Sequence, residues 1–243
     1  MSVFEAIAKS LNSFETVARL KPGETIYLIE KKVKLTQLKM LYEHLPQGLA
    51  ATVLNASLLA YILAGMVPAR TAYIWLASIV IVCGMRLAAT LAFRRVCDDT
   101  EDYAGWRNIF AAGAFLTGAL WGLAGVALYP AGSYQHQAFI GFVLAGMAAG
   151  ASGSMAAHDR IFRVFLVLTV APYMVRLAFD GTPIDLAMSA MCAAFIAALS
   201  MSSIRNARAT CAALQLKFEN DDLLTELKTS SPGTPRRQRS AQK

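Results

Sequence analysis

Four polar residues lie within or next to long apolar segments, at positions where they could bind a ligand. Asn55 and Arg86 each interrupt a long apolar segment, Arg176 lies near the end of another, and His158 opens the short turn HDR. An ionisable group inside a membrane segment is a functional hypothesis by default, because burying it is costly. We therefore take these four residues as candidates for ligand recognition or sensing.

Each candidate also has a plainer structural use. The side chain of Arg86 could reach the inner membrane surface, or it could face the bundle interior and pair with a polar group or an anionic ligand. Arg176 precedes Asp180 by four residues, the spacing of a local ion pair on a helix. Asn55 could hydrogen-bond another helix or line a ligand cavity. His158 could be a proton relay or pH sensor, or a solvated residue that caps the next helix.

The sequence contains no recognisable arrangement for catalysis or metal binding. The histidines His44, His136 and His158 are not spaced as metal ligands on one helix face, and the cysteines include no CxxC pair. There is no nucleophile–base arrangement and no nucleotide motif. We therefore expect no enzyme activity, no metal and no cofactor. The basic end RRQRSAQK is short and lacks aromatic residues, so nucleic acid is not an expected partner.

The glycine-rich stretch FIGFVLAGMAAGASGSMAAHDR, residues 139–160, could be a phosphate-binding loop or a packed helix. A phosphate loop needs a strand-to-helix turn with a Lys-Ser/Thr pair or a following acidic residue, and neither surrounds these glycines. Glycines four apart on a helix instead let another helix backbone approach closely. The preceding apolar segment has the same spacing, so the two segments are expected to pack on each other or on a symmetry mate. The glycines are Gly118, Gly122, Gly125, Gly146, Gly150 and Gly153.

Long apolar segments hold all of these residues. Of the 243 residues, 56% are hydrophobic and 16% are charged, whereas soluble domains have about 25% charged residues. A helix of about 20 apolar residues spans a bilayer. Six such segments predict an all-α, polytopic integral membrane protein with a six-helix transmembrane domain over residues 46–204. The predicted spans are 46–67, 71–93, 104–129, 137–157, 162–179 and 184–204.

Basic residues are concentrated in alternate connections between the spans. Arg94, Arg95 and Arg107 lie in one connection and Arg160 and Arg163 in the next but one, while YPAGSYQHQ and DGTPID have no Lys or Arg. Basic loops stay on the cytoplasmic side of a membrane. The pattern predicts a multi-pass protein of the bacterial inner membrane, with both termini in the cytoplasm.

The segments that flank the spans have helical periodicity. Residues 1–45 are predicted to form two cytoplasmic amphipathic helices, broken at KPGE, before a first span that begins at Pro46. Residues 205–228 continue the last span, either with the heptad-like spacing of a two-stranded coiled coil or as a single amphipathic helix on the membrane. The basic tail over residues 229–243 is predicted to be disordered. The residues of the predicted signalling helix are Ile204, Cys211, Leu214, Phe218 and Asn220.

Four stretches of the sequence together resemble a known family. They are IEKKVKLTQLKMLYEHLPQGLAATVLNASLLAYIL, GALWGLAGVALYP, FVLAGMAAGASGSMAAH and LQLKFENDDLLTEL. Their order and spacing are similar to the six-helix N-terminal input region of bacterial hybrid sensor histidine kinases and related diguanylate cyclases. In that family the last membrane helix continues into a coiled coil that joins a dimeric kinase or cyclase domain. Neither domain follows Lys228 in this sequence, so the chain is expected to be a fragment, a truncated or frame-shifted gene product, or a free-standing membrane module. The resemblance then implies a sensory and signal-transmitting role, and kinase or cyclase activity is not carried over to this chain.

These features lead to one main functional hypothesis and two alternatives. The chain is expected to be a sensory module of the two-component type that relays a stimulus through the helix after span six. Its expected partners are the lipid bilayer, a second copy of the chain and a cytoplasmic signalling protein. A small-molecule transporter would instead have inverted repeats and broken helices, of which a kink at Pro172 is the one sign. The second alternative is an accessory or assembly subunit of a larger membrane complex.

Overall fold

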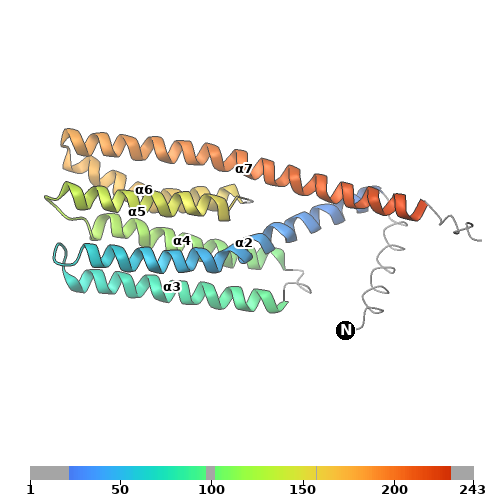
Figure 1. Cartoon of the computed structure of the whole chain (residues 1–243), viewed down its shortest axis with the longest axis horizontal. Helices are drawn as coiled ribbons and strands as arrows, with labels where there is room; N and C mark the ends of the chain where they lie inside the picture. The colour runs from blue at the N-terminus through green and yellow to red at the C-terminus, as the bar shows by residue number, and fades with distance from the viewer. Residues whose placement is uncertain (1–21, 97–101, 157, 231–243) are drawn as a thin grey trace, which may run out of the picture. The chain divides into compact units, whose positions relative to one another are not determined.

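The fold is all helical. A computed structural model describes residues 22–96, 102–156 and 158–230. These residues form six α-helices, each long and apolar enough to cross a membrane, so the predicted all-α, six-span membrane protein is confirmed. The helices are α2 (Pro22–Ile62), α3 (Ala69–Val96), α4 (Tyr103–Ala127), α5 (Tyr134–Ser154), α6 (Asp159–Asp180) and α7 (Pro183–Ser230) (Figure 1).

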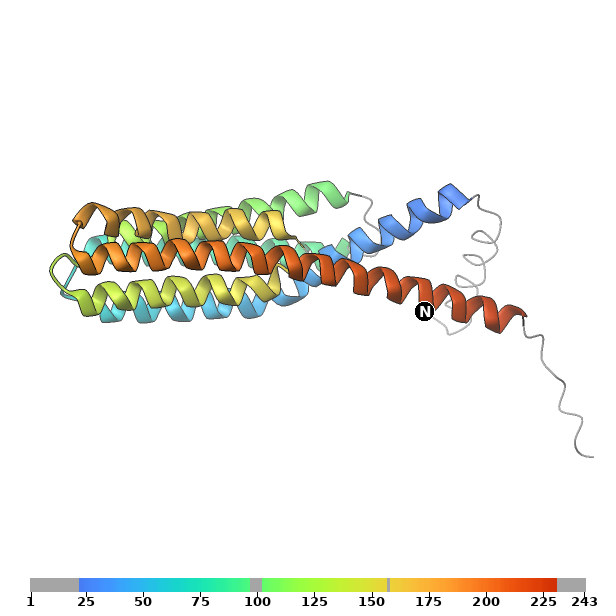
Figure 2. The same cartoon turned by 90° about the horizontal axis from the view of Figure 1, so that it is seen from above.

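Residues 34–210 form one compact unit in which the helices lie side by side (Figures 1 and 2). The remaining described residues, 22–33 and 211–230, are the beginning of α2 and the end of α7, and they belong to a second unit. The helix predicted over residues 1–20 and most of the predicted basic tail lie outside the described residues. The bundle begins earlier than the predicted residue 46, because Leu38, Leu41 and Tyr42 are core residues that are at most 2% exposed.

Short polar residues and a glycine determine where several helices begin and end. Oδ1 of Asp102 accepts a hydrogen bond from the backbone N–H of Gly105 (2.8 Å) and caps α4. α6 ends at Gly181, whose φ of 72° lies in the left-handed region that favours glycine. Oγ1 of Thr182 accepts from the backbone N–H of Asp185 (3.2 Å) and donates to its carboxylate (2.6 Å), which starts α7. Tight turns of this kind make neighbouring spans antiparallel.

Pro46 does not begin a helix, contrary to the prediction. It lies inside α2, which continues through it. Because proline has no N–H, the carbonyl of Tyr42 loses its intrahelical partner at this point. The flanking side chains of Leu45 and Leu49 are nevertheless buried, at 8% and 6% exposure, on one side of the helix. We infer that packing of this apolar face favours a continuous helix more than the lost hydrogen bond disfavours it.

Helices α4 and α6 share the most extensive contact in the bundle. Three glycines of α4 allow it. A Cβ at Gly122 would collide with the backbone carbonyl of Leu168, and a Cβ at Gly125 would lie 2.6 Å from the Cβ of Tyr173. Gly118 faces α6 in the same way. These glycines thus bring two helix backbones together, and their main partner is α6; from the expected α5 only the side chain of Leu144 comes near, 3.4 Å from a Cβ at Gly125.

The glycines of α5 have a different environment. A Cβ at Gly146, Gly150 or Gly153 would meet nothing within 4 Å, so no helix of the described chain packs against them. The expectation that these glycines pack against those of α4 is therefore wrong within one chain. α5 contacts α6 through another face, where a Cβ at Gly141 would lie 3.1 Å from the ring of Tyr173. The spacing of small residues marks an open helix face, but it does not identify what fills the space.

Aromatic side chains join α2 and α3 to α4. The ring of Tyr42 stacks on Phe93 with 4.2 Å between centroids, and its hydroxyl donates to the backbone carbonyl of Trp106 (2.9 Å). Farther along the bundle, the indole N–H of Trp75 donates to the backbone carbonyl of Leu120 (2.7 Å). The polar tips of these large side chains are therefore satisfied inside the bundle, and they fix the height of one helix against the next.

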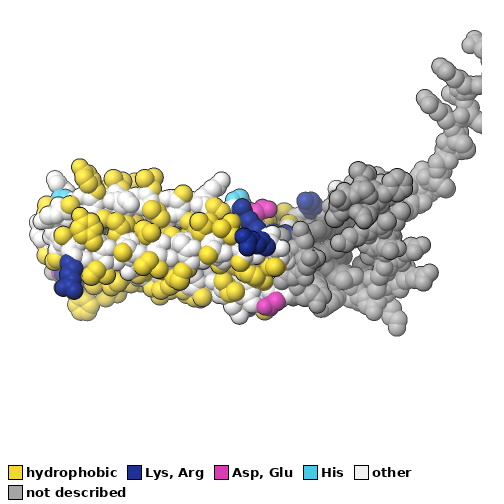
Figure 3. All heavy atoms as spheres, turned by 90° about the horizontal axis from the view of Figure 1, so that it is seen from below, with side chains coloured by type: hydrophobic (Ala, Val, Ile, Leu, Met, Phe, Trp, Pro, Cys, Tyr) yellow, Lys and Arg dark blue, Asp and Glu magenta, His cyan; other side chains and the backbone are white. Residues whose placement is uncertain are grey.

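The outer surface of the bundle is apolar. Figure 3 shows hydrophobic side chains along the face in view, with charged side chains near its ends. Large apolar side chains face outward on α2 to α6, including Leu54, Ile81, Leu123, Phe142 and Phe179, which is 81% exposed. A soluble monomer rarely exposes such a large apolar area, whereas lipid tails match it. The bundle is a multi-pass membrane domain embedded in lipid.

Helix α7 is the least tightly packed of the six spans. In its most apolar 18-residue segment only 6% is buried, whereas 28% to 44% of the corresponding segment is buried in each of the other five spans. One side contacts the core through residues that include Met188, Cys192 and Phe195. The hydroxyl of Ser189 also donates to the backbone carbonyl of Met174 (3.1 Å). Large apolar side chains elsewhere on α7 are exposed, including those of Leu186, Met191 and Met201.

Candidate functional site

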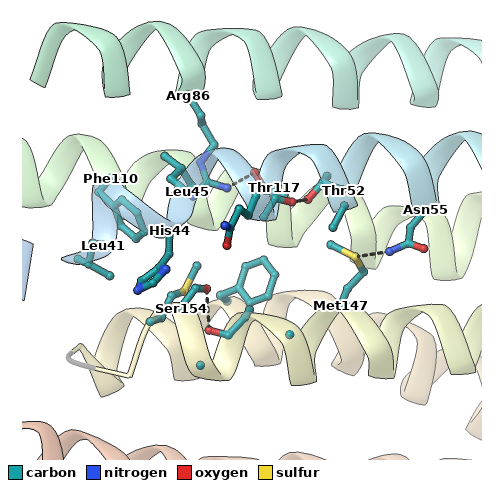
Figure 4. Close-up of a pocket in the computed structure, with 18 of the residues that line it drawn as sticks. Leu41, His44, Leu45, Thr52, Asn55, Arg86, Phe110, Thr117, Met147 and Ser154 are labelled. Atoms are coloured by element: carbon teal, nitrogen blue, oxygen red, sulfur yellow. Dashed lines mark hydrogen bonds between the residues drawn. The ribbon is translucent and has the colours of Figure 1, made fainter. Parts of the chain in front are cut away.

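A cavity of about 380 Å³ lies within the bundle (Figure 4). Its volume is within the range of small-molecule sites. The walls come mainly from residues 41–55 of α2 and from residues 146–154 of α5 with its C-cap residue Met155, and further side chains come from α3, α4 and α6. Two of the four predicted candidates, Asn55 and Arg86, line it together. The other two, His158 and Arg176, do not.

Small residues on two facing helices create the cavity. Gly48 and Ala51 of α2 line one side, and Gly146, Gly150 and Gly153 of α5 line the other. All five are exposed to the cavity or its surroundings. The glycine-rich stretch of α5 therefore keeps space open beside α2. Side chains of ordinary size at these positions would fill that space.

Most of the remaining lining is apolar, and none of the lining residues is acidic. Large hydrophobic side chains surround the space: Leu41, Leu45, Phe110, Met147, Met155 and Phe165. Within residues 22–96, 102–156 and 158–230, no three His, Cys, Asp or Glu side chains come together in a way that could hold a metal ion. The only permanently charged side chain in the lining is that of Arg86.

The guanidinium of Arg86 is buried and only partly hydrogen-bonded. The residue is 8% exposed, and its Nη1 donates to Oγ1 of Thr117 (3.1 Å). Nε and Nη2 are buried without a hydrogen-bond partner. The ring of Phe110 lies beneath the group, with its centroid 5.5 Å from Cζ, and the missing side chain at Gly113 makes room for the arginine stem. Most of the guanidinium's donors are therefore unused.

The direction of the Arg86 side chain decides between its two predicted uses. Phe93 and Trp106 are in contact (5.4 Å between centroids), so they mark the same height on α3 and α4. At 1.5 Å per residue, Arg86 is about 10 Å deeper than this level and Thr117 is about 16 Å deeper. The hydrogen bond to Thr117 thus draws the guanidinium away from the nearer helix ends. The side chain faces the bundle interior and does not extend to the membrane surface.

Asn55 lines the cavity and also joins two helices. Its Nδ2 lies 3.3 Å from Sδ of Met147 on α5, and a thioether is a weak acceptor. The nearby hydroxyl of Thr52 donates to the carbonyl of Gly48 within its own helix (2.8 Å). The amide of Asn55 could therefore exchange this weak acceptor for a stronger one on a ligand.

Arg176 has the local use that its spacing suggested. Its guanidinium forms an ion pair with Asp180 and lies 4.4 Å from the centroid of the Tyr129 ring. Both charged side chains are near the C-terminal end of α6, and neither lines the cavity. Nothing in this arrangement calls for a ligand.

His158 is not a solvated turn residue. It is half-buried before α6, and its Nε2 lies 2.9 Å from the hydroxyl of Tyr103 on α4. Burial lowers the pKa of His158, the nearby cation of Arg107 lowers it further, and Asp159 opposes this change. The neighbouring Asp159 is itself paired with Arg163 (2.7 Å). The structure therefore favours the neutral imidazole at this junction.

We expect acid to destabilise the bundle through His158. Because the pKa is lower in the folded than in the unfolded chain, the stability contribution is complete above about pH 6.5 and is lost as the pH falls through the folded-state pKa. The free energy of unfolding in detergent, measured from pH 8 to pH 5, should fall in the native protein and fall less in His158→Gln. His136→Gln, at the other end of α5, should behave like the native protein. Equal pH dependence in all three would contradict this role.

The residues that sequence reasoning missed are mostly uncharged. Thr117, Phe110 and Gly113 of α4 together position the Arg86 guanidinium, and their residue types alone do not indicate this. The GxxxT spacing of Gly113 and Thr117 puts both on one helix face, which was the one available signal. His44 also borders the cavity.

The predicted signalling residues lie along α7. Ile204, Cys211 and Leu214 are half-buried and Asn220 is exposed, while the side chain of Phe218 lies outside the described residues. α7 remains helical through all of these positions. The last span and residues 205–230 therefore form one continuous helix, and a signalling role for it stays a prediction.

Comparison with known proteins does not assign the chain to a family. No protein-family model matches the sequence, and no curated protein or solved structure is significantly similar to it. The resemblance to kinase and cyclase input regions thus stays a prediction.

Proposed function

We propose that the chain is a membrane-embedded sensory module that relays the state of its cavity through α7. It would lie in the bacterial inner membrane with both termini in the cytoplasm, and would act as a homodimer on a cytoplasmic signalling protein. The observation that carries the proposal is the continuity of α7, a single helix of 48 residues of which residues 183–210 belong to the bundle and residues 211–230 to the second unit. A continuous helix can convey a small displacement at one end to the other.

The loose packing of α7 supports this role. Only 6% of its most apolar 18-residue segment is buried, so few contacts would have to change for the helix to shift or rotate. In contrast, α4 and α6 are held together by backbone contacts at glycines and form a fixed frame. A mobile helix on a rigid frame is the arrangement that a transmitter requires. The cavity supplies a place where a ligand could favour one position of α7 over another.

Cysteine crosslinking in membranes tests the proposal. In a background without the other native cysteines, Cys211 or Ile204→Cys should form disulfides between two copies on mild oxidation, whereas Ala209→Cys, on the opposite face of the helix, should not. Adding Gly150→Leu, which occupies the cavity, should change the crosslinking yield at these positions. Efficient crosslinking at Ala209→Cys as well would contradict a parallel pair of transmitting helices. So would crosslinking yields that are the same with and without Gly150→Leu.

Transport is the second candidate, because the same cavity could hold a substrate in transit. Pro172 lies inside α6 and faces Gly122 of α4, where a Cβ would come within 2.8 Å of its Cγ. A proline at such a tight contact is a possible hinge. Uptake of a labelled compound into proteoliposomes, abolished by Arg86→Met, would favour transport. Cavity-dependent crosslinking without uptake would favour the sensory module.

A further inference from the structure

We propose that the cavity binds an amphipathic monoanion, with its anionic group on Arg86 and its apolar tail against the hydrophobic lining. The ligand would be a carboxylate or an equivalent singly charged group joined to a hydrocarbon or aromatic tail. The proposal of a binding site depends only on the cavity. The proposal that this ligand is the stimulus of the protein rests on the sensory function proposed above.

The charge of the cavity requires an anion from outside the described chain. A guanidinium stays protonated in proteins, and an unpaired charge in a low-dielectric interior is strongly unfavourable. Arg86 forms no ion pair with any described residue, and no lining residue is acidic. The carboxylates at the two ends of α6, Asp159 and Asp180, lie outside the lining and are each paired with an arginine of their own helix. A bound anion would therefore lower the electrostatic cost of burying Arg86.

The unused donors define the shape of the anionic group. Nε and Nη2 belong to one edge of the planar guanidinium, and both are buried without partners. This edge matches two oxygens of one carboxylate in a bidentate pair. Thr117 occupies the Nη1 side and holds the plane of the group in place. One fixed positive charge is best balanced by one negative charge, so a doubly charged phosphate monoester fits less well.

The rest of the lining defines the remainder of the ligand. Much of the cavity wall is apolar and is formed by Leu41, Leu45, Met155 and Phe165. A small inorganic anion on Arg86 would leave this apolar part of the cavity unfilled. The cavity is bordered by exposed glycines of α5, so a tail could extend between α2 and α5. Two sources share this chemistry, namely a free carboxylic acid with an apolar tail and the phosphodiester of an anionic phospholipid.

Equilibrium binding in nanodiscs of phosphatidylcholine tests the site. Radiolabelled decanoate should bind the full chain with saturation, and decanol, which lacks the charge, should compete at least about tenfold more weakly. Arg86→Met should weaken decanoate binding by about tenfold or more, and Arg86→Lys should fall between the two because it keeps the charge without the planar edge. Arg95→Met, an exposed arginine of the same helix outside the lining, should bind like the native protein.

Two further measurements show whether Arg86→Met is folded and whether the bound anion is a free acid or a phospholipid. Arg86→Met removes an unpaired buried charge, so it should melt at or above the native temperature. If phosphatidylglycerol in the nanodisc reduces decanoate binding only when Arg86 is present, the lipid occupies the same site. Retention of phosphatidylglycerol by the native protein but not by Arg86→Met, without decanoate binding, would assign the site to the lipid.

The proposal is overturned if neither anion binds in an Arg86-dependent way, or if decanol binds as tightly as decanoate. Binding of the anion that leaves α7 crosslinking unchanged would keep the ligand site and refute only the sensory function. Crosslinking that responds to Gly150→Leu but never to an anion would keep the sensory function and refute this ligand.

Discussion

Replacing Gly122 with alanine is expected to destabilise the bundle by about 1–3 kcal/mol, the usual cost of overpacking a core. The new Cβ would collide with the backbone carbonyl of Leu168 and approach Cγ of Pro172 to 2.8 Å. A backbone carbonyl cannot move aside as a flexible side chain can, so α4 would have to separate from α6. Thermal unfolding in detergent, and unfolding by sodium dodecyl sulfate, would measure the loss.

Gly84→Ala is the matched control for this change. Gly84 is also in the middle of a transmembrane helix, but a Cβ there meets nothing within 4 Å. Alanine favours a helix over glycine, so this variant should be as stable as the native protein or slightly more stable. If the two variants unfold alike, the α4–α6 contact is not the frame of the bundle.

Replacing Gly150 with leucine is expected to weaken ligand binding strongly while leaving the bundle stable. A Cβ at Gly150 meets nothing within 4 Å, and the residue borders the cavity, so the longer side chain can enter the empty space without forcing helices apart. Filling an empty space usually costs little or stabilises a protein. Decanoate binding in nanodiscs should weaken by about tenfold or more, comparable to the loss expected for Arg86→Met.

The control for Gly150→Leu is Gly84→Leu, which adds the same side chain to an open helix face outside the cavity lining. It should bind decanoate like the native protein. Unchanged affinity in Gly150→Leu would show that the ligand does not occupy the space beside α5. A large loss of thermal stability in Gly150→Leu alone would instead mean that the glycine contacts another helix, as in an assembly of two chains.

The helices could be predicted because their cause is local. Twenty apolar residues in a row, ended by sequences such as DGTPID, specify a span by themselves, and the pairing of Arg176 with Asp180 follows from their position on one turn of helix. The same reasoning failed at Pro46, where the burial of Leu45 and Leu49 in the assembled bundle keeps the helix continuous. Tertiary packing overrode a local signal at that point.

The candidate site could be predicted only in part. Arg86 and Asn55 were found because polar residues in apolar segments are conspicuous, but the sequence left open which way each side chain points. The direction of Arg86 depends on Thr117 and Gly113 of α4, and that of Asn55 on Met147 of α5. The glycines of α4 and α5 have the same spacing, yet the first set contacts α6 and the second borders a cavity. Spacing within one helix does not identify the element across from it.

The most direct test of coupling between the cavity and α7 is a distance measurement between two spin labels. One label replaces exposed Met191 of α7 and the other replaces exposed Ile81 of α3, in a cysteine-free background and in phosphatidylcholine nanodiscs. Decanoate should shift the distance distribution in the protein with Arg86 and leave it unchanged in Arg86→Met. An identical distribution with and without decanoate, in protein shown to bind it, would contradict the proposal that the cavity controls α7.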